Sequence, residues 1–190
     1  MNQQYSIIYA DPPWRYGNRC AHSKTKFGGG VHAHYPTMSD QEIIDLGEKI
    51  KRITAPNAAL FLWATMPRLP LAIAVLEAWG FRFATTAFTW VKTTKQGTPA
   101  TGPGFYTASN AEVCLLGIKG KMPPAVRLVG SAILAPRREH SRKPDEVRHR
   151  IELMYPEAKR LELFCRFPAP GWDVIGNQLE DAKDVREALA

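Results

Sequence analysis

The chain alternates between short apolar runs and segments in which apolar residues recur at helical spacing. Five runs rich in apolar, β-branched or aromatic residues predict strands: residues 6–10, 58–64, 81–92, 112–118 and 159–166. The run at 58–64 is continuously apolar, as strands buried on both faces are. Three helices are predicted, over residues 39–51, 68–79 and 143–154, and the second has apolar residues at helical spacing. Residues 172–177 are a further strand candidate. Strands that alternate with helices predict one α/β domain across residues 1–190, with a mostly parallel sheet and helices on both faces.

Local signals mark the ends of the predicted helices. Ser39, followed by Glu42, predicts a capping box at the start of the first helix. Gly80 is placed to end the second helix, and Pro144 lies near the expected first turn of the third. Each predicted helix therefore has a local signal at one of its ends.

Charge and composition narrow the class of protein. The formal net charge is +7, which favours a polyanionic partner because Lys and Arg release counterions from phosphates, although many basic proteins bind no nucleic acid. No apolar run reaches the roughly 18 residues of a membrane-spanning helix, and the N-terminus has no secretory signal pattern. Three cysteines are too few for a disulfide framework. We therefore expect a cytoplasmic protein with no membrane partner.

Metal and thiol chemistry are not favoured. Cys20, His22, His32 and His34 could be drawn as a zinc cluster, but their spacing matches no strong zinc pattern. No proline precedes any of the three cysteines, as the nucleophile of a cytosine C5-methyltransferase would require. We predict no metal site.

The stretch "ADPPW" directly follows the first predicted strand. A nucleobase amine is a poor nucleophile, because its lone pair is delocalised into the ring. The carboxylate of Asp11 and the carbonyl of Pro12 could accept its two hydrogens and free that lone pair, with Pro13 stiffening the turn. Trp14 could stack on the base, a contact worth about 1–3 kcal/mol. The alternative is a strand-terminating turn with a half-buried tryptophan.

Three long segments without periodicity are candidate target-recognition elements: residues 15–38, 93–109 and 119–142. Such loops are unusual in compact domains and tend to be functional. Aromatic residues among basic ones suit a splayed-out base, and a basic loop can grip phosphates, although a solvated charge run is its usual explanation. The candidate substrate-binding residues in or beside these loops are Tyr16, Lys24, Lys26, Lys92, Tyr106, Arg137, Arg138 and Arg142.

Seven short motifs occur in an order that resembles a known family: "ADPPWRY", "HYPTMS", "LFLWAT", "EAWGF", "EHSRKPDEV", "LELFCR" and "GWDVIGNQ". Together, over residues 5–178, they resemble the DPPW-type, S-adenosylmethionine-dependent N(6)-adenine methyltransferases. That family includes the catalytic subunit of the eukaryotic mRNA adenosine methyltransferase and bacterial and phage DNA methylases. The resemblance implies a Rossmann-like class I methyltransferase fold in permuted order, with the catalytic motif before the cofactor-binding strand.

The resemblance also implies roles for individual residues. Asp11 would lie between the cofactor's amino-acid end and the target amine, and Lys143, with help from Ser141, would pair with the cofactor's carboxylate. Glu162 would accept hydrogen bonds from the ribose hydroxyls, with Arg166 close by. The adenosine contacts would come from Asn177 and Gln178. Taken singly, each of these residues also suits a surface charge, a strand edge or a turn.

The sequence therefore predicts transfer of a methyl group from S-adenosylmethionine to the N(6) amine of adenine in DNA, by direct in-line displacement on a flipped-out base. Tyr16 would be a second wall for that base. RNA as the substrate, N(4)-cytosine methylation and a non-catalytic nucleic-acid-binding subunit are the alternatives. The single short domain is similar to compact bacterial or phage members, for which a homodimer or an accessory subunit is a further expectation.

Overall fold

The computed structural model describes residues 4–15, 37–102, 106–138, 142–176, 179 and 184–189. A seven-stranded sheet crosses this part of the chain in the order β5-β3-β4-β2-β1-β6-β7. Only β4 runs antiparallel to its neighbours in the sheet, and the other four pairings are parallel. The strands are β1 (Tyr5–Ala10), β2 (Thr54–Ala64), β3 (Arg82–Thr93), β4 (Ala111–Lys119), β5 (Ala132–Pro136), β6 (Arg160–Leu163) and β7 (Asp173–Ile175). The predicted mostly parallel α/β sheet is confirmed.

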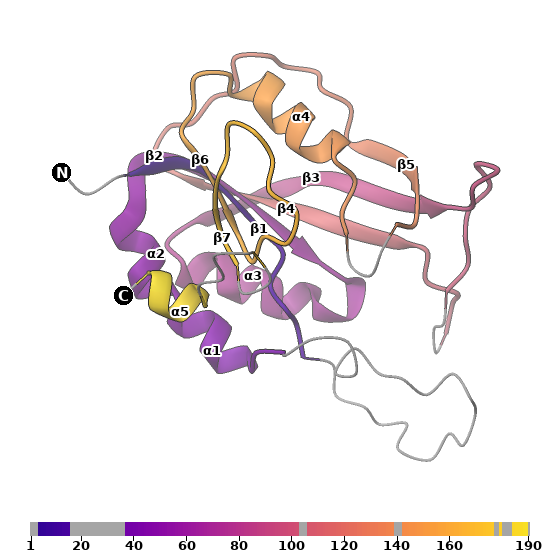
Figure 1. The fold of residues 1–190 in the computed structure, drawn as a ribbon, viewed down its shortest axis with the longest axis horizontal. Helices are drawn as coiled ribbons and strands as arrows, with labels where there is room; N and C mark the ends of the chain where they lie inside the picture. The colour runs from indigo at the N-terminus through magenta and orange to yellow at the C-terminus, as the bar shows by residue number, and fades with distance from the viewer. Residues whose placement is uncertain are drawn as a thin grey trace.

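Helices cover both faces of the sheet, as predicted. Figure 1 shows α4 on one side and α1, α2, α3 and α5 on the other. None of the described helices is long and apolar enough to cross a membrane. The helical segments are α1 (Asp40–Asp45), α2 (Gly47–Ile53), the 3-10 turn η2 (Met66–Arg68), α3 (Leu69–Ala78), α4 (Glu146–Met154) and α5 (Val185–Ala188).

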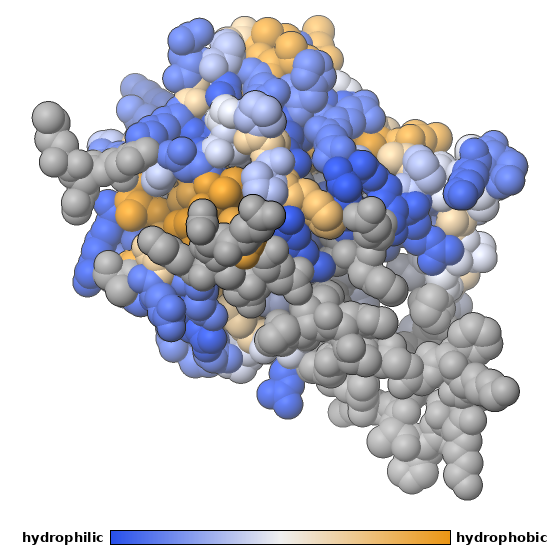
Figure 2. Space-filling model, viewed as in Figure 1, coloured by the Kyte–Doolittle hydropathy of each residue, from blue (hydrophilic) through white to orange (hydrophobic). Residues whose placement is uncertain are grey.

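Strand alternation divides the core into two apolar clusters. In β1, Ile8 packs in the cluster that contains α1, α2 and α3, whereas Ile7 and Tyr9 pack in the cluster that contains α4. Successive side chains of a strand point to opposite faces, so one continuous apolar run fills both clusters. In the view of Figure 2 most of the described surface is hydrophilic, with smaller apolar areas between.

Two predicted helices have different bounds in the structure. The capping box of Ser39 and Glu42 is confirmed, but the segment predicted over residues 39–51 breaks at Leu46 into α1 and α2. Gly47, the first residue of α2, allows a close approach to α3, since a Cβ there would lie 2.5 Å from the carbonyl oxygen of Ala78. The helix predicted over residues 143–154 begins only at Glu146, so Pro144 lies just before α4.

One predicted strand and one predicted loop also differ from what the structure shows. The strand predicted over residues 159–166 ends at Leu163, because Phe164 takes a left-handed backbone conformation with a φ of 61°. The loop predicted over residues 119–142 contains the edge strand β5, which pairs with β3 in parallel. A short edge strand in a basic, proline-containing segment carries little of the apolar signal that marks central strands.

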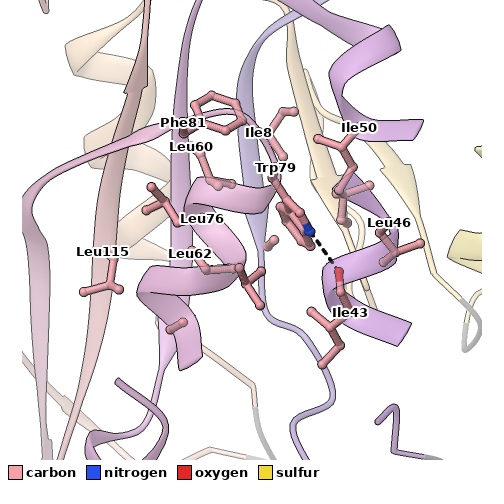
Figure 3. Close-up of a cluster of buried hydrophobic side chains, with 14 of the residues drawn as sticks. Ile8, Ile43, Leu46, Ile50, Leu60, Leu62, Leu76, Trp79, Phe81 and Leu115 are labelled. Carbon is pink, nitrogen blue, oxygen red and sulfur yellow. Dashed lines mark hydrogen bonds between the residues drawn. The ribbon is translucent and has the colours of Figure 1, made fainter. Parts of the chain in front are cut away.

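Trp79 joins the end of α3 to α1 inside the core. Its side chain is fully buried, and its Nε1–H donates to the carbonyl oxygen of Ile43 at 2.8 Å (Figure 3). That carbonyl lies in the last turn of α1, whose C-cap is Leu46. Backbone carbonyls in the last turn of a helix lack hydrogen-bond partners within the helix. The indole therefore satisfies a buried acceptor as well as filling space.

We expect Trp79→Phe to lower the free energy of unfolding by about 2–4 kcal/mol, because it leaves a cavity and a buried carbonyl without its donor. Trp172→Phe is the matched control: the indole of Trp172 donates to the carboxylate of Glu152, whose side chain is 36% exposed and can bond to water instead. Urea unfolding followed by circular dichroism measures both. Equal losses in the two variants would contradict the assigned role of the Trp79 hydrogen bond.

Candidate active site

The candidate site lies at the edge of the sheet where the parallel strands end. Asp11 follows β1, and Glu162 lies near the end of β6. Because β4 is antiparallel, its first residues reach the same edge, where Glu112 pairs in register with Trp90 of β3. The segment before α4 adds Lys143. Open α/β sheets bind ligands at this edge, and a cleft here is lined by Asp11, Lys143 and Glu162, among others.

Four charged side chains form a chain of alternating sign at this edge. Lys143 Nζ lies 2.6 Å from Asp11 Oδ2 and 3.2 Å from Glu112 Oε2. The second oxygen of Glu112 contacts Lys92 Nζ at 2.5 Å. The side chain of Lys143 is 10% exposed and that of Glu112 is 14% exposed. Two cations and two anions therefore compensate one another in a largely buried place.

The pKa values follow from burial and from these neighbours. Burial raises the pKa of Asp11 above its ordinary value, although Lys143 opposes that shift. Burial alone would lower the pKa of Lys143, but Asp11 and Glu112 outweigh it and raise that pKa. Burial alone would raise the pKa of Glu112, but Lys143 and Lys92 outweigh it and lower that pKa. Lys143 is therefore charged at neutral pH, and its charge is divided between two carboxylates.

The Asp-Pro-Pro-Trp turn is fixed by backbone hydrogen bonds. The carbonyl oxygen of Pro12 accepts from the backbone N–H of Trp14 at 2.8 Å, and that of Pro13 accepts from Met38 at 3.1 Å. A carbonyl oxygen has two lone pairs, so Pro12 can accept a further hydrogen bond. The turn thus holds a carboxylate and a carbonyl acceptor on adjacent residues.

Trp14 differs from the prediction. The sequence suggested that its ring would stack on a base, but the residue is 4% exposed and belongs to the core cluster beneath α1 and α3. Its Nε1–H donates to the carbonyl oxygen of Trp63 at 3.0 Å. The structure therefore gives Trp14 an anchoring position, close to the alternative of a partly buried tryptophan after a strand.

Glu162 is held by an arginine that the sequence did not single out. Arg148 Nε donates to Glu162 Oε2 at 2.8 Å, and Nη2 donates to Oε1 at 2.9 Å. Burial raises the pKa of the Glu162 carboxyl, and Arg148 opposes the shift. Arg166, predicted beside Glu162, lines the same cleft.

Some of the predicted substrate-binding residues are engaged within the protein, and others are exposed. Lys92 belongs to the ion chain instead of a free phosphate-binding surface. Arg138 pairs with Asp145, and Arg142 lies over the ring of Phe167 at 4.3 Å. Three of the predicted residues are exposed, namely Arg137, Arg138 and Tyr106, and of these Arg138 pairs with Asp145.

Several predicted residues lie outside the part of the chain that the structure describes. These are Tyr16, Lys24 and Lys26 of the predicted recognition loop, and Ser141, Asn177 and Gln178 of the predicted cofactor site. The zinc candidates Cys20, His22, His32 and His34 lie outside it too. Within the described residues there is no group of three or more His, Cys, Asp or Glu side chains that could hold a metal ion.

Sequence reasoning missed Glu112 and Arg148. A signal for Glu112 existed, because an acid directly before an apolar run is the counterpart of Asp11 directly after one. Arg148 gave no such signal, since it lies in a helix with charged residues on both sides. The fold brings it to Glu162, because α4 covers the face of the sheet toward which the Glu162 side chain points.

The charged groups that line the cleft define the kind of ligand that can bind there. The ammonium of Lys143 suits a carboxylate, the carboxylate of Asp11 suits a cationic group, and Glu162 suits hydroxyl donors. A ligand that carries an amino acid at one end and a diol at the other matches this set. The amino-acid and ribose parts of S-adenosylmethionine have this chemistry, so the residues present fit that group.

Comparison with known proteins identifies the family. The chain is 34% identical to the type II methyltransferase M.MunI of a Mycoplasma species, over 95% of this chain and 80% of that protein. It is 33% identical to an N(6)-adenosine-methyltransferase MT-A70-like protein of Arabidopsis thaliana, over 97% of this chain but 25% of that protein. The human N(6)-adenosine-methyltransferase catalytic subunit METTL3 is 31% identical, over 93% of this chain and 28% of its own length. The chain thus spans most of M.MunI but about a quarter of these two longer relatives.

The MT-A70 family matches residues 5–178, the range over which the seven motifs resemble the DPPW-type methyltransferases. This match and the similarity to M.MunI cover nearly the whole chain and bear out the predicted resemblance. The chain belongs to the MT-A70 family of methyltransferases.

Proposed function

We propose that this chain transfers a methyl group from S-adenosylmethionine to the N(6) amine of adenine in DNA. The observation that carries the proposal is Asp11 at the end of β1, held at 2.6 Å by Lys143 beside the carbonyl of Pro12. Family membership supports methyl transfer, and the names of the plant and human relatives support the N(6) position. The 80% coverage of M.MunI, a type II methyltransferase, favours DNA over RNA.

Residues of the cleft would hold the cofactor at both ends. Lys143 would pair with its carboxylate, Asp11 would face its ammonium, and Glu162 would accept from its ribose hydroxyls, with Arg166 nearby. Ser141, Asn177 and Gln178 complete the proposed set. When bound, S-adenosylmethionine supplies a methyl group that its sulfonium already activates.

The chain's own task is to orient the target amine. Asp11 and Pro12 present two hydrogen-bond acceptors on one rigid turn. Both hydrogens of the amine can therefore be bonded, and the nitrogen lone pair is then no longer delocalised into the ring. Lys143 keeps the Asp11 carboxylate charged and in place. Alignment of the two reactants is then enough for a direct in-line displacement, without a covalent enzyme intermediate. In duplex DNA the adenine must first be flipped out, at a cost of a few kcal/mol.

Contacts with the nucleic acid would come from residues around the cleft. Arg137 and Tyr106 are exposed and free to meet a phosphate and a base, respectively. Tyr16, Lys24 and Lys26 are further proposed contacts. We propose a cytoplasmic enzyme of bacterial or phage origin that acts as a homodimer or with an accessory subunit on duplex DNA.

We expect Asp11→Asn to lower turnover by at least about 100-fold, because the amide offers one acceptor oxygen and no negative charge to the amine. The assay uses labelled S-adenosylmethionine with unmodified bacterial DNA, digestion to nucleosides, and mass spectrometry for N(6)-methyldeoxyadenosine. Asp45→Asn, on the outer side of α1, is the matched control and keeps wild-type turnover. Near-normal turnover in Asp11→Asn would contradict the proposed mechanism.

The same assay separates the alternative functions. Product on RNA but not on DNA would change the substrate, and N(4)-methyldeoxycytidine would change the base. Absence of product together with absence of S-adenosylmethionine binding would favour a non-catalytic nucleic-acid-binding subunit. The presence of Asp11, Lys143 and Glu162 argues for the enzyme.

We expect Lys143→Met to lower the free energy of unfolding by about 3 kcal/mol at pH 7, since it leaves the Asp11 carboxylate buried without its cation. Burial then keeps the folded-state pKa of Asp11 above its unfolded value, so the folded state binds more protons. The deficit against wild type should therefore shrink as the pH falls from 7 to 5. Urea unfolding at several pH values measures it, with Lys95→Met on an exposed turn as control. A deficit that does not change with pH would contradict the assigned pairing.

A further inference from the structure

Arg148 connects three parts of the cleft from a single position in the first turn of α4. Its guanidinium makes the two-pronged contact with Glu162 of β6, and Nη2 also donates to the carbonyl oxygen of Phe167 at 2.8 Å. Nη1 lies 3.4 Å from Asp145, just before the helix. The side chain is 13% exposed, and it lines the cleft with Glu162 and Phe167.

The segment after β6 turns away from the sheet through a residue other than glycine in the left-handed backbone conformation. Cofactor-binding turns of α/β proteins often use glycines after the strand, but Phe164 takes the left-handed conformation here. The turn is then fixed from two sides, because Arg148 holds the Phe167 carbonyl and Arg142 lies over the Phe167 ring. Contacts from arginine side chains, and not glycine residues, therefore hold this turn in its conformation.

Arg148 also favours the charged form of Glu162. The Glu162 side chain is 10% exposed, and the titratable groups that face it are Arg148 from α4, Tyr9 of β1, Asp11 after β1 and Cys165 in the turn. Burial and Asp11 raise its pKa, whereas Arg148 and a hydrogen bond with Cys165 lower it. A two-pronged arginine contact uses about half of the acceptor positions of a carboxylate, so the others stay available for hydroxyl donors.

We infer that Arg148 is a positioning residue for the cofactor: it keeps the Glu162 carboxylate charged and oriented toward the cleft, and it fixes the turn at residues 164–167. This inference rests on the proposed function, because Glu162 would bind the ribose of S-adenosylmethionine. Arg148 itself need not touch the cofactor.

Arg150 provides a matched control on the same helix. It too combines a contact to a carboxylate, that of Glu146, with hydrogen bonds to backbone carbonyls, those of Gly130 and Ala132. These contacts tie α4 to the start of β5 and to the segment before it, and Arg150 does not line the cleft. Loss of Arg150 therefore tests the general effect of removing a helix-anchoring arginine.

The experiment measures binding of S-adenosylhomocysteine and S-adenosylmethionine to the full chain by calorimetry from pH 5.5 to 8.5. We expect Arg148→Met to weaken binding by about 10- to 100-fold at pH 7, as loss of a charged, two-pronged contact does. The fall in affinity toward acid should also begin at higher pH than in wild type, because Glu162 loses the cation that lowers its pKa. Arg150→Met should keep the wild-type affinity and pH profile even where its stability is lower.

Arg148→Lys keeps the charge but not the planar two-pronged geometry, so it separates the two effects. We expect it to restore the wild-type pH profile while its affinity stays below that of wild type. This variant also keeps the inference testable where Arg148→Met does not fold. Wild-type affinity and pH profile in either folded Arg148 variant would overturn the inference and leave the proposed function intact. Absence of binding to the wild-type chain would overturn both the proposed cofactor and this inference.

Discussion

The candidate site depends on one buried cation, Lys143, that is shared by two carboxylates. Removing charges from water is costly unless they are paired and hydrogen-bonded, so Asp11, Lys143 and Glu112 can be buried only together. Their assembly needs β4 to run against its neighbours, because only then do its first residues lie beside the ends of β2 and β3, at the edge where β1 also ends. The one antiparallel strand of the sheet thus completes the charge balance of the cleft.

The core beneath the cleft gives this charged group a rigid base. Trp14 hydrogen-bonds to the backbone of Trp63, and Lys143 Nζ lies 5.4 Å from the centre of the Trp63 ring. Trp63 in turn donates to the hydroxyl of Tyr9 within the cluster that contains α4. Aromatic side chains from adjacent strands therefore support the Asp-Pro-Pro-Trp turn from below. A target amine needs acceptors in fixed positions, and this packing supplies that constraint.

Features that depend on residues close together in the chain could be predicted from the sequence. Contacts between residues far apart in the chain could not. Continuous apolar runs identified the central strands, and the acid at the end of the first strand identified Asp11. The strand end at Leu163 was missed, because the left-handed backbone of Phe164 has no local signature. The partner of Glu162 was missed for a related reason: Arg148 looks like any surface residue of a charged helix until α4 packs on the sheet. Pairing across the fold is a property of packing, which one sequence does not display.

The two buried ion pairs of the cleft share a plan that makes α4 its organising element. In each pair the carboxylate comes from the end of a central strand, and the cation comes from α4 or from the segment that leads into it. Asp11 thus depends on Lys143, and Glu162 on Arg148. The helix is held against the sheet by Val147 and Ile151, which are fully buried. A shift of α4 would therefore disturb both ends of the cleft at once, so the apolar packing of one short helix sets the electrostatics of the whole site.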